Sequence, residues 1–187
     1  DANIDLNKNI DKTKIIYGVG ARHQKVNSSA YLSDGESTFY NSTRYPEKGS
    51  AIQDVFGYGQ VAFNVYKDFN LLIGARLNKE RLIAKFNNPF LDFDTIKNNN
   101  VSFVKSILLS YKIKTSTLSL SYYDGFRNPN IDDVGKIFSK DGENVVVPNP
   151  ALEPEYSKNL EASLNISSEF VKLKIELFKT KIYNAIS

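Results

Sequence analysis

Residues 122–163 decide the fold class of this chain. They read Tyr-Tyr-Asp-Gly-Phe-Arg-Asn-Pro-Asn-Ile-Asp-Asp-Val-Gly over 122–135 and Pro-Asn-Pro-Ala-Leu-Glu-Pro-Glu-Tyr-Ser-Lys-Asn-Leu-Glu-Ala-Ser over 148–163. Pro129 has no backbone N–H to give to a strand ladder, so a strand must end before it. Three further prolines hold the returning segment extended: Pro148, Pro150 and Pro154. The stretch therefore predicts a strand, a long connection and a second strand.

Alternation of apolar and polar residues continues outward from this stretch in both directions. In residues 70–81, for example, Leu71, Ile73 and Leu77 share one face, whereas Arg76 and Glu80 share the other. Such a period of two is the pattern of a β-strand with two different faces. It predicts about eight strands, over residues 4–9, 14–26, 55–66, 70–81, 101–113, 116–127, 158–166 and 170–180.

The connections between the predicted strands alternate in length. Short polar turns are expected at 10–13, 67–69, 114–115 and 167–169, and long connections at 32–53, 82–100 and 128–157. Tight turns at one end and long loops at the other are typical of transmembrane β-barrels. The strands also have about the 9–11 residues that a tilted strand needs to cross a bilayer. We therefore predict an all-β fold, an antiparallel up-and-down meander of about eight strands that is part of a large transmembrane β-barrel.

Two other β folds share much of this pattern. A soluble antiparallel sheet with one face on a core, which would be a binding module, gives the same alternation. Eight strands can also close a small outer-membrane barrel, which would have a structural or adhesion role. Aromatic residues near the predicted short turns favour the membrane, because barrels carry aromatic girdles at the interface: Tyr66, Phe69, Tyr111 and Phe170. Glycines and cations on the polar face favour a wide barrel, since a narrow one would need those charges paired across its interior.

Composition excludes several classes of function. The 187 residues include no cysteine and a single histidine, His23, so disulfide scaffolds and cysteine- or histidine-rich metal sites are excluded. A net charge of +3 is too small to indicate nucleic-acid binding. No convincing nucleophile–base pair can be assembled, so an enzyme is the least favoured class, and no cofactor or metal is expected. No apolar run approaches the ~18 residues of a transmembrane helix.

Two short boxes carry a resemblance to a known family. Residues Gly125–Asn130 read Gly-Phe-Arg-x-Pro-Asn, and Asn149–Glu155 read Asn-Pro-x-Leu-x-Pro-Glu. In this order they resemble the late barrel of TonB-dependent outer-membrane receptors, as do residues 44–50 and 178–186. The resemblance implies that residues 1–187 are a single piece of a barrel of roughly 22 strands. Its family-motif residues are Gly125, Phe126, Arg127, Pro129, Asn130, Asn149, Pro150, Leu152, Pro154 and Glu155.

The same resemblance implies a function and a set of partners. Such receptors lie in the outer membrane of Gram-negative bacteria, contact its lipid, and take up a small-molecule cargo. The cargo is a ferric siderophore, haem or a similar iron chelate, or cobalamin. Energy reaches them from the TonB complex through a plug domain, which this sequence does not contain. Residues 128–157 lack the histidine that haem receptors carry between the two boxes, and His23 is expected to face lipid.

Several residues are candidates for contact with cargo. The possible ligand contacts are Arg44, Tyr45, Arg127 and Tyr156. A purely loop-shaping role for the two boxes is favoured over direct contact, with Arg127 pairing with Glu155 or Glu161. The cations on the polar face could attract an anionic cargo, although pairing with neighbouring carboxylates is favoured: Arg22, Arg76, Lys172 and Lys174. Asn98–Asn100 is expected to lie in a loop.

Overall fold

Eight strands form one antiparallel sheet. A computed structural model describes residues 1–41, 43, 45–87, 92–135, 138–139, 145–146 and 148–186. The sheet strands are β1 (Ala2–Ile10), β2 (Thr13–Val26), β5 (Ser50–Tyr66), β6 (Phe69–Lys85), β7 (Thr95–Ile113), β8 (Ser116–Arg127), β11 (Glu155–Ser167) and β12 (Lys172–Tyr183). Each strand pairs with the sheet strand before it in the chain. The predicted antiparallel meander is therefore confirmed.

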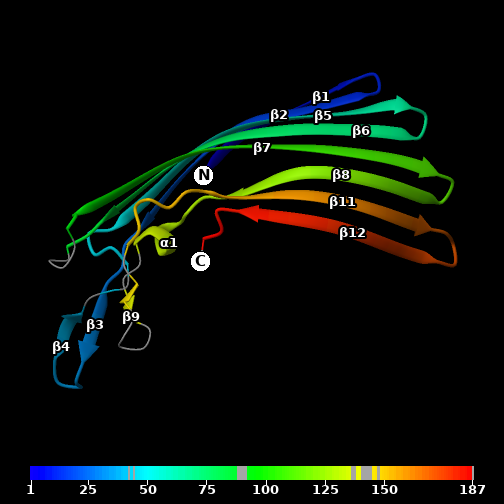
Figure 1. Cartoon of the computed structure of the whole chain (residues 1–187). Coiled ribbons are helices and arrows are strands. Elements are labelled where there is room, and N and C mark those ends of the chain that lie inside the picture. Colours follow the sequence, from blue (N-terminus) through cyan, green and yellow to red (C-terminus); the bar gives the residue numbers. More distant parts are fainter. Residues whose placement is uncertain are drawn as a thin grey trace.

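Short and long connections lie at opposite ends of the sheet (Figure 1). The long connections contain two small hairpins and a helix: β3 (Ala30–Ser33), β4 (Thr38–Asn41), α1 (Ile131–Gly135), β9 (Phe138–Ser139) and β10 (Val145–Val146). At the other end, three two-residue turns begin with residues of positive φ, namely Asp11 at 49°, Lys67 at 28° and Lys114 at 52°. Among the described residues, no helix has the length and apolar character needed to cross a membrane.

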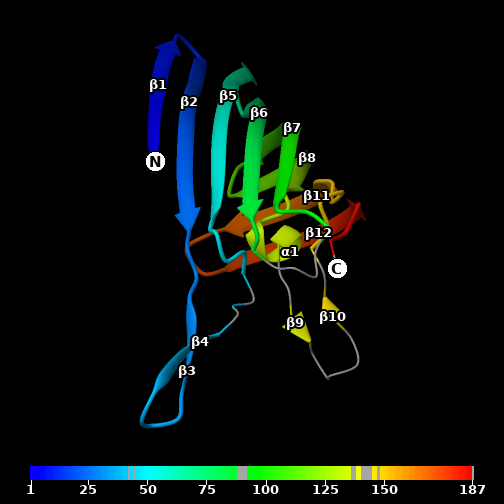
Figure 2. The same cartoon turned by 90° about the vertical axis from the view of Figure 1, so that its left-hand side faces the viewer.

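The sheet curls, and α1 lies inside its curve (Figure 2). We call the face that α1 covers the concave face and the other the convex face. Cross-strand register brings Val19, Gly57, Leu77 and Phe103 into one row on the convex face. Val19, Leu77 and Phe103 are 59%, 54% and 58% exposed. A continuous exposed apolar surface of this kind requires an apolar environment.

Aromatic rings lie at the short-turn end of the sheet, as predicted. The rings of Phe69 and Tyr111 are 6.4 Å apart between centroids, and the Lys67 ammonium lies 5.8 Å from the ring of Tyr66. Tyr66 and Phe170 are strongly exposed. This arrangement matches an interfacial girdle, in which amphipathic rings lie between lipid and water.

Large side chains on the concave face lie across glycines of the neighbouring strand. The Tyr58 hydroxyl donates to Asp5 across Gly18. The ring of Phe56 covers Gly20, and the Arg76 guanidinium carbon lies 4.0 Å from the centre of that ring. These glycines permit the close lateral packing of the large side chains beside them.

Several strands extend further at the long-connection end than predicted, and three of them, β5, β6 and β7, do so by four or more residues. β5 begins at Ser50 rather than 55, β6 ends at Lys85 rather than 81, and β7 begins at Thr95 rather than 101. The alternation reverses there, because apolar residues now occupy the concave face. They form the buried core together with residues of α1: Ile52, Leu82, Ala84, Phe86, Ile96, Ile131 and Val134. The prediction followed the convex face alone and therefore ended these strands too early.

We predict that Gly18→Ala destabilises the protein by about 1–3 kcal/mol, the range for overpacked sites. A Cβ at Gly18 would lie 2.6 Å from Asp5 Oδ1 and 2.7 Å from the backbone oxygen of Ile4, which cannot easily move. The control is Gly59→Ala, because no atom lies within 4 Å of the added Cβ. The free energy of unfolding in urea, measured in detergent micelles, checks both. Equal stability of the two variants would contradict the packing role of Gly18.

Candidate functional site: the concave face beneath the long connections

Helix α1 closes the concave face at the long-connection end. Its residues Ile131 and Val134 are buried against Leu82, Phe86 and Ile96 of the sheet and the β6–β7 connection. Burying side chains of this size stabilises a structure by about 1.5–3 kcal/mol each. The α1 part of the connection between β8 and β11 is thus folded inward and forms a roof over the inside of the curved sheet.

The first family box ends β8 and starts α1. Pro129 is fully buried, and the strand ends at Arg127, as its position predicts. The Asp133 N–H donates to Asn130 Oδ1 at 3.0 Å, and the Asn130 N–H donates to Asp133 Oδ2 at 2.9 Å. This reciprocal pair is a capping box, which satisfies two N–H groups that a helix start leaves without partners.

Arg127 stabilises this cap through Asp133. Its guanidinium donates to both carboxylate oxygens of Asp133, each at 2.7 Å. The predicted pairing of Arg127 with Glu155 or Glu161 is therefore wrong. Glu155 does lie opposite Arg127 in the register, but it accepts a hydrogen bond from the Ile186 N–H at 3.1 Å. The capping turn brings Asp133 back to the end of β8, where its carboxylate pairs with the Arg127 guanidinium.

The second family box is anchored to β7. The Asn98 amide donates to the backbone oxygens of Leu152 at 2.9 Å and Pro150 at 3.4 Å. The N–H of Asn149 donates to the Val134 oxygen at 3.1 Å, and Leu152 packs on the core. The box therefore joins α1 to the wall of the sheet.

A polar column on β7 holds both boxes at once. Asn98, Asn100 and Ser102 are 6%, 8% and 0% exposed and share the concave face. Asn100 donates to Asn98, and the Ser102 hydroxyl donates to Asn128 Oδ1 at 3.1 Å. The prediction that Asn98–Asn100 lies in a loop is wrong, because this segment belongs to β7.

Below the roof lies a polar cleft of about 330 Å³. Buried carboxylates of Asp54 and Glu80 face Arg22, whose Nη2 lies 3.6 Å from Asp54 and 3.8 Å from Glu80. The favoured prediction for Arg22, pairing with neighbouring carboxylates, is therefore confirmed. The cleft is bordered by residues of both the sheet and the first box: Arg22, Asp54, Arg76, Asn78, Phe126, Pro129 and Asn130.

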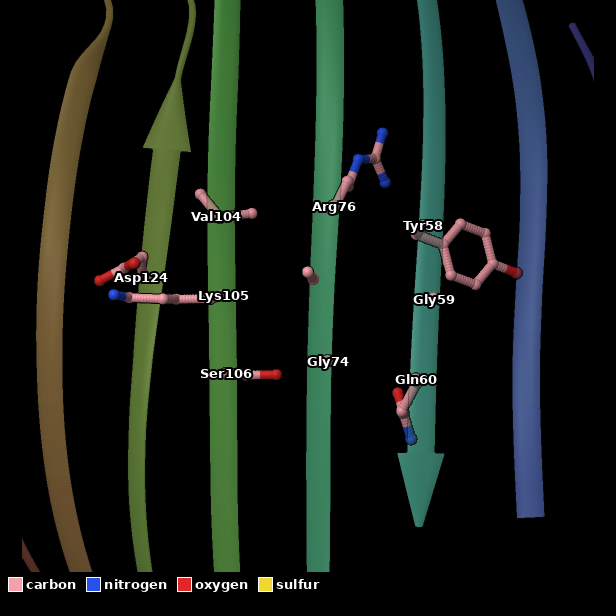
Figure 3. A pocket seen from close by; sticks show the side chains of 10 residues that line it. Tyr58, Gly59, Gln60, Gly74, Arg76, Val104, Lys105, Ser106 and Asp124 are labelled. Carbon is pink, nitrogen blue, oxygen red and sulfur yellow. The ribbon is translucent and has the colours of Figure 1, made fainter.

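Arg76 carries positive charge into this cleft without a carboxylate partner among the described residues. Its Nη2 donates to Asn78 Oδ1 at 3.4 Å. Arg76 also borders a second cavity of about 300 Å³ further down the same wall. Figure 3 shows this cavity with Arg76, Tyr58 and Ser106 on adjacent strands, and Tyr58 reaching across β2. On the same face, Lys174 pairs with Glu176.

The remaining predicted contacts lie away from the cleft. Tyr45 packs against the core of the roof. The Tyr156 hydroxyl donates to the Val101 oxygen at 3.5 Å, and Tyr156 borders a different cavity with Asn99. Arg44 lies outside the described residues. His23 is exposed on the convex face, in the row of Gln53, as expected of a lipid-side residue.

Metal-binding chemistry finds little support in this part of the chain. Within the described ranges, no group of three or more histidine, cysteine or acidic residues is placed to hold a metal ion. The site offers amide groups, two carboxylates and arginines. Such groups can bind a polar molecule by hydrogen bonds and charge.

The sequence analysis missed two features of the site, although a recognisable sequence pattern marks one of them. Asn130 and Asp133 are spaced as a capping box directly after a proline, which marks a helix start. No sequence pattern marks the anchoring by Asn98 and Ser102, because only the register of β7 shows which face of the sheet they occupy.

Comparisons with known proteins agree with this architecture. The sequence model of the family described as "TonB dependent receptor-like, beta-barrel" matches residues 1–187. No curated protein is significantly similar to the chain.

Three solved structures share the fold at low sequence identity. A double mutant of the Serratia marcescens hemophore receptor HasR, in complex with its hemophore HasA and heme, has TM-score 0.73 at 13% identity, with 96% of this chain and 32% of that chain covered. The copper transporter OprC has TM-score 0.79 at 12% identity, with 96% and 29% covered. The FrpB iron transporter of Neisseria meningitidis (F3-3 variant) has TM-score 0.64 at 15% identity, with 98% and 27% covered. This chain thus spans about a third of their length or less.

We predict that Asn98→Ala loosens the second box, because it leaves the oxygens of Pro150 and Leu152 without their amide donor. Lost hydrogen bonds of this kind cost about 1–3 kcal/mol, so amides at 149–155 should exchange roughly five- to 150-fold faster. The matched control is Asn99→Ala, one residue along β7 on the exposed face. Hydrogen exchange followed by mass spectrometry checks the result, and equal exchange in both variants would refute the anchoring role.

Proposed function

The chain belongs to the TonB-dependent receptor β-barrel family, and we propose that it forms part of an outer-membrane receptor for a scarce nutrient. Energy for uptake would come from the TonB complex, acting through a plug domain. Residues 1–187 would be a single piece of the barrel. The fold supports this, since β1 and β12 lie at opposite edges of the sheet and do not pair with each other. The eight strands thus form an open segment rather than a small closed barrel.

The observation that carries the proposal is the roofed polar cleft on the concave face. Its wall combines the buried side chains of Asp54, Asn78 and Glu80 with Arg22 and Arg76. A cargo that passes the inside of a barrel must exchange its water for hydrogen bonds to the wall, because a buried polar group without a partner costs free energy. The amides and arginines of this cleft supply such partners.

Charge favours a cargo with acidic groups. Arg22 is held by Asp54 and Glu80, whereas Arg76 has no ion pair among the described residues and contacts the neutral Asn78 and the Phe56 ring. A guanidinium is suited to oxygen anions, which it binds in a planar fork. We therefore propose a ferric siderophore or a similar iron chelate as the cargo.

Metal-bearing cargo also agrees with the structural neighbours, whose descriptions name heme, copper and iron. Haem and cobalamin are the alternatives for this chain. Haem is the less favoured of these, because residues 128–157 contain no histidine and His23 is on the convex face.

The two boxes are proposed to shape the roof, and the ligand contacts remain predictions. Arg127 stabilises the cap of α1 through Asp133, and Asn149 joins the same helix. Direct contact with cargo is therefore proposed first for Arg76. Arg127, Tyr45, Tyr156 and Arg44 follow as secondary candidates.

We predict that Arg76→Gln weakens binding of the cargo about tenfold or more, since hydrogen bonds to charged groups contribute roughly 1.5–3 kcal/mol. Arg76→Lys should recover part of the loss, because it keeps the charge. Lys12→Gln, in the β1–β2 turn, is the control. The measurement is binding and TonB-dependent uptake of labelled cargo by cells that carry the full-length receptor. Ferric siderophores and haem carry radioactive iron, and cobalamin carries radioactive cobalt.

Two results would contradict the proposal. Uptake of none of these cargoes under iron limitation would exclude the transport function as stated. Uptake that is unchanged in Arg76→Gln would exclude the cleft as the binding wall while leaving transport intact.

A further inference from the structure

The convex face has a shallow groove that the proposed function does not use. It has a volume of about 560 Å³ and opens across β1, β2, β5 and β6, which lie side by side in Figure 1. Its lining is mostly apolar and includes one cation at the long-connection end: Ile4, Val19, Val55, Gly57, Leu77 and Lys79.

Two glycines keep this part of the convex face open. Gly57 and Gly59 occupy successive convex positions of β5. A Cβ at Gly57 would meet only ordinary contacts at 3.8 Å, and one at Gly59 would meet nothing within 4 Å. Neither has a positive φ. Gly18 and Gly74 differ, because neighbouring atoms already fill their space, with Ser106 Oγ 2.9 Å from a Cβ at Gly74. A glycine inside a strand commonly marks the close approach of a ligand, and no part of the described chain fills the space at Gly57 and Gly59.

Four cations lie at the long-connection end of the groove. Lys79 borders it, Arg81 lies one convex position further along β6, and Lys25 and Lys97 flank the next convex row. All four are exposed, and within the described residues none of them forms an ion pair. They form what we call the cationic cluster.

The cluster has no acidic counterpart on the strands that carry it. The convex positions of β2, β5, β6 and β7 include no aspartate or glutamate. The carboxylates of these strands in the same region, Asp54 and Glu80, lie on the concave face with Arg22. The convex sides of β2, β6 and β7 therefore present positive charge without a neighbouring carboxylate at the end of the apolar surface.

We propose that the groove and the cationic cluster together bind a phosphorylated lipid of negative charge from the surrounding leaflet. One acyl chain lies in the groove over Gly57 and extends past Gly59, the next convex position outside the groove, and the phosphate contacts Lys79 and Arg81. The inference rests on the membrane placement given under the proposed function. A lipid is the occupant that fits, because the groove is continuous with the exposed apolar surface of Val19 and Leu77. The cations stand at its end, where a headgroup would lie.

The first test fills the groove. Gly57→Val and Gly59→Val add side chains that meet no close contact in the structure, and valine is favoured in strands. Both variants should therefore fold. The added side chains occupy the space proposed for the acyl chain. The control is Ala162→Val, a small residue paired with Leu120 and Leu177 of the same apolar surface, away from the groove. Native mass spectrometry of the full-length receptor in detergent with added phosphatidylglycerol should show fewer bound lipids for the two glycine variants only.

The second test removes the charge. Lys79→Gln and Arg81→Gln should each weaken phosphatidylglycerol binding roughly fivefold, the effect of one basic residue near a membrane surface. Lys8→Gln, on the convex side of β1 near the short turns, is the control. Phosphatidylcholine with the same acyl chains should bind more weakly to the unaltered receptor and should not respond to either cation variant. Added salt should weaken the phosphatidylglycerol complex.

Three outcomes would overturn the inference. One is equal binding of the two lipids, a second is binding that is unchanged in both glycine variants, and a third is a change of oligomeric state in those variants, which would assign the groove to a second copy of the chain. TonB-dependent uptake is measured separately on the same variants. Failure of lipid binding with normal uptake therefore leaves the proposed function standing, and loss of uptake in Arg76→Gln does not affect the lipid site.

Discussion

Hydrogen bonding between neighbouring strands is the constraint on which the rest of this structure depends. In a lipid environment no water satisfies a free backbone N–H or C=O, so each strand needs a partner on both sides. The ladder from β1 to β12 meets this demand over most of the sheet. The exceptions are its two edges, the register shift between Asn64 and Tyr66, and the long-connection part of β7, which pairs with β8 only over residues 106–113. The ladder also fixes which side chains share a face. The apolar convex surface, the polar concave wall and the cleft are all consequences of one register.

The long-connection end of the sheet has a different distribution of apolar residues. Apolar residues such as Leu82 and Ile96 turn to the concave face and form a small water-excluding core with Ile131 and Val134. This core, rather than the sheet, determines where the roof lies. The two family boxes act together in it: one caps the helix and the other holds the helix against β7.

Much of the fold can be predicted from the sequence, and the failures have a common cause. Leu71, Ile73 and Leu77 alternate so regularly that strand and face follow directly, and Pro129 marks a strand end. The extensions to Ser50, Lys85 and Thr95 were missed because the apolar face changes sides there. Arg127 was assigned to Glu155, its cross-strand neighbour, because the capping turn that brings Asp133 nearer depends on how α1 packs. The cleft needs four strands in register, which no local pattern shows, and the ligand contacts stay predictions.

The polar column of β7 has a consequence for the conditions under which the roof holds. Asn98, Asn100 and Ser102 are amides and a hydroxyl, and their hydrogen bonds to the two boxes involve no titrating group. Acid, alkali and salt change charges, but they leave such bonds in place. The attachment of the second box to β7 is thus independent of pH and salt, whereas the cap of α1, which uses the Asp133 carboxylate and Arg127, depends on charge.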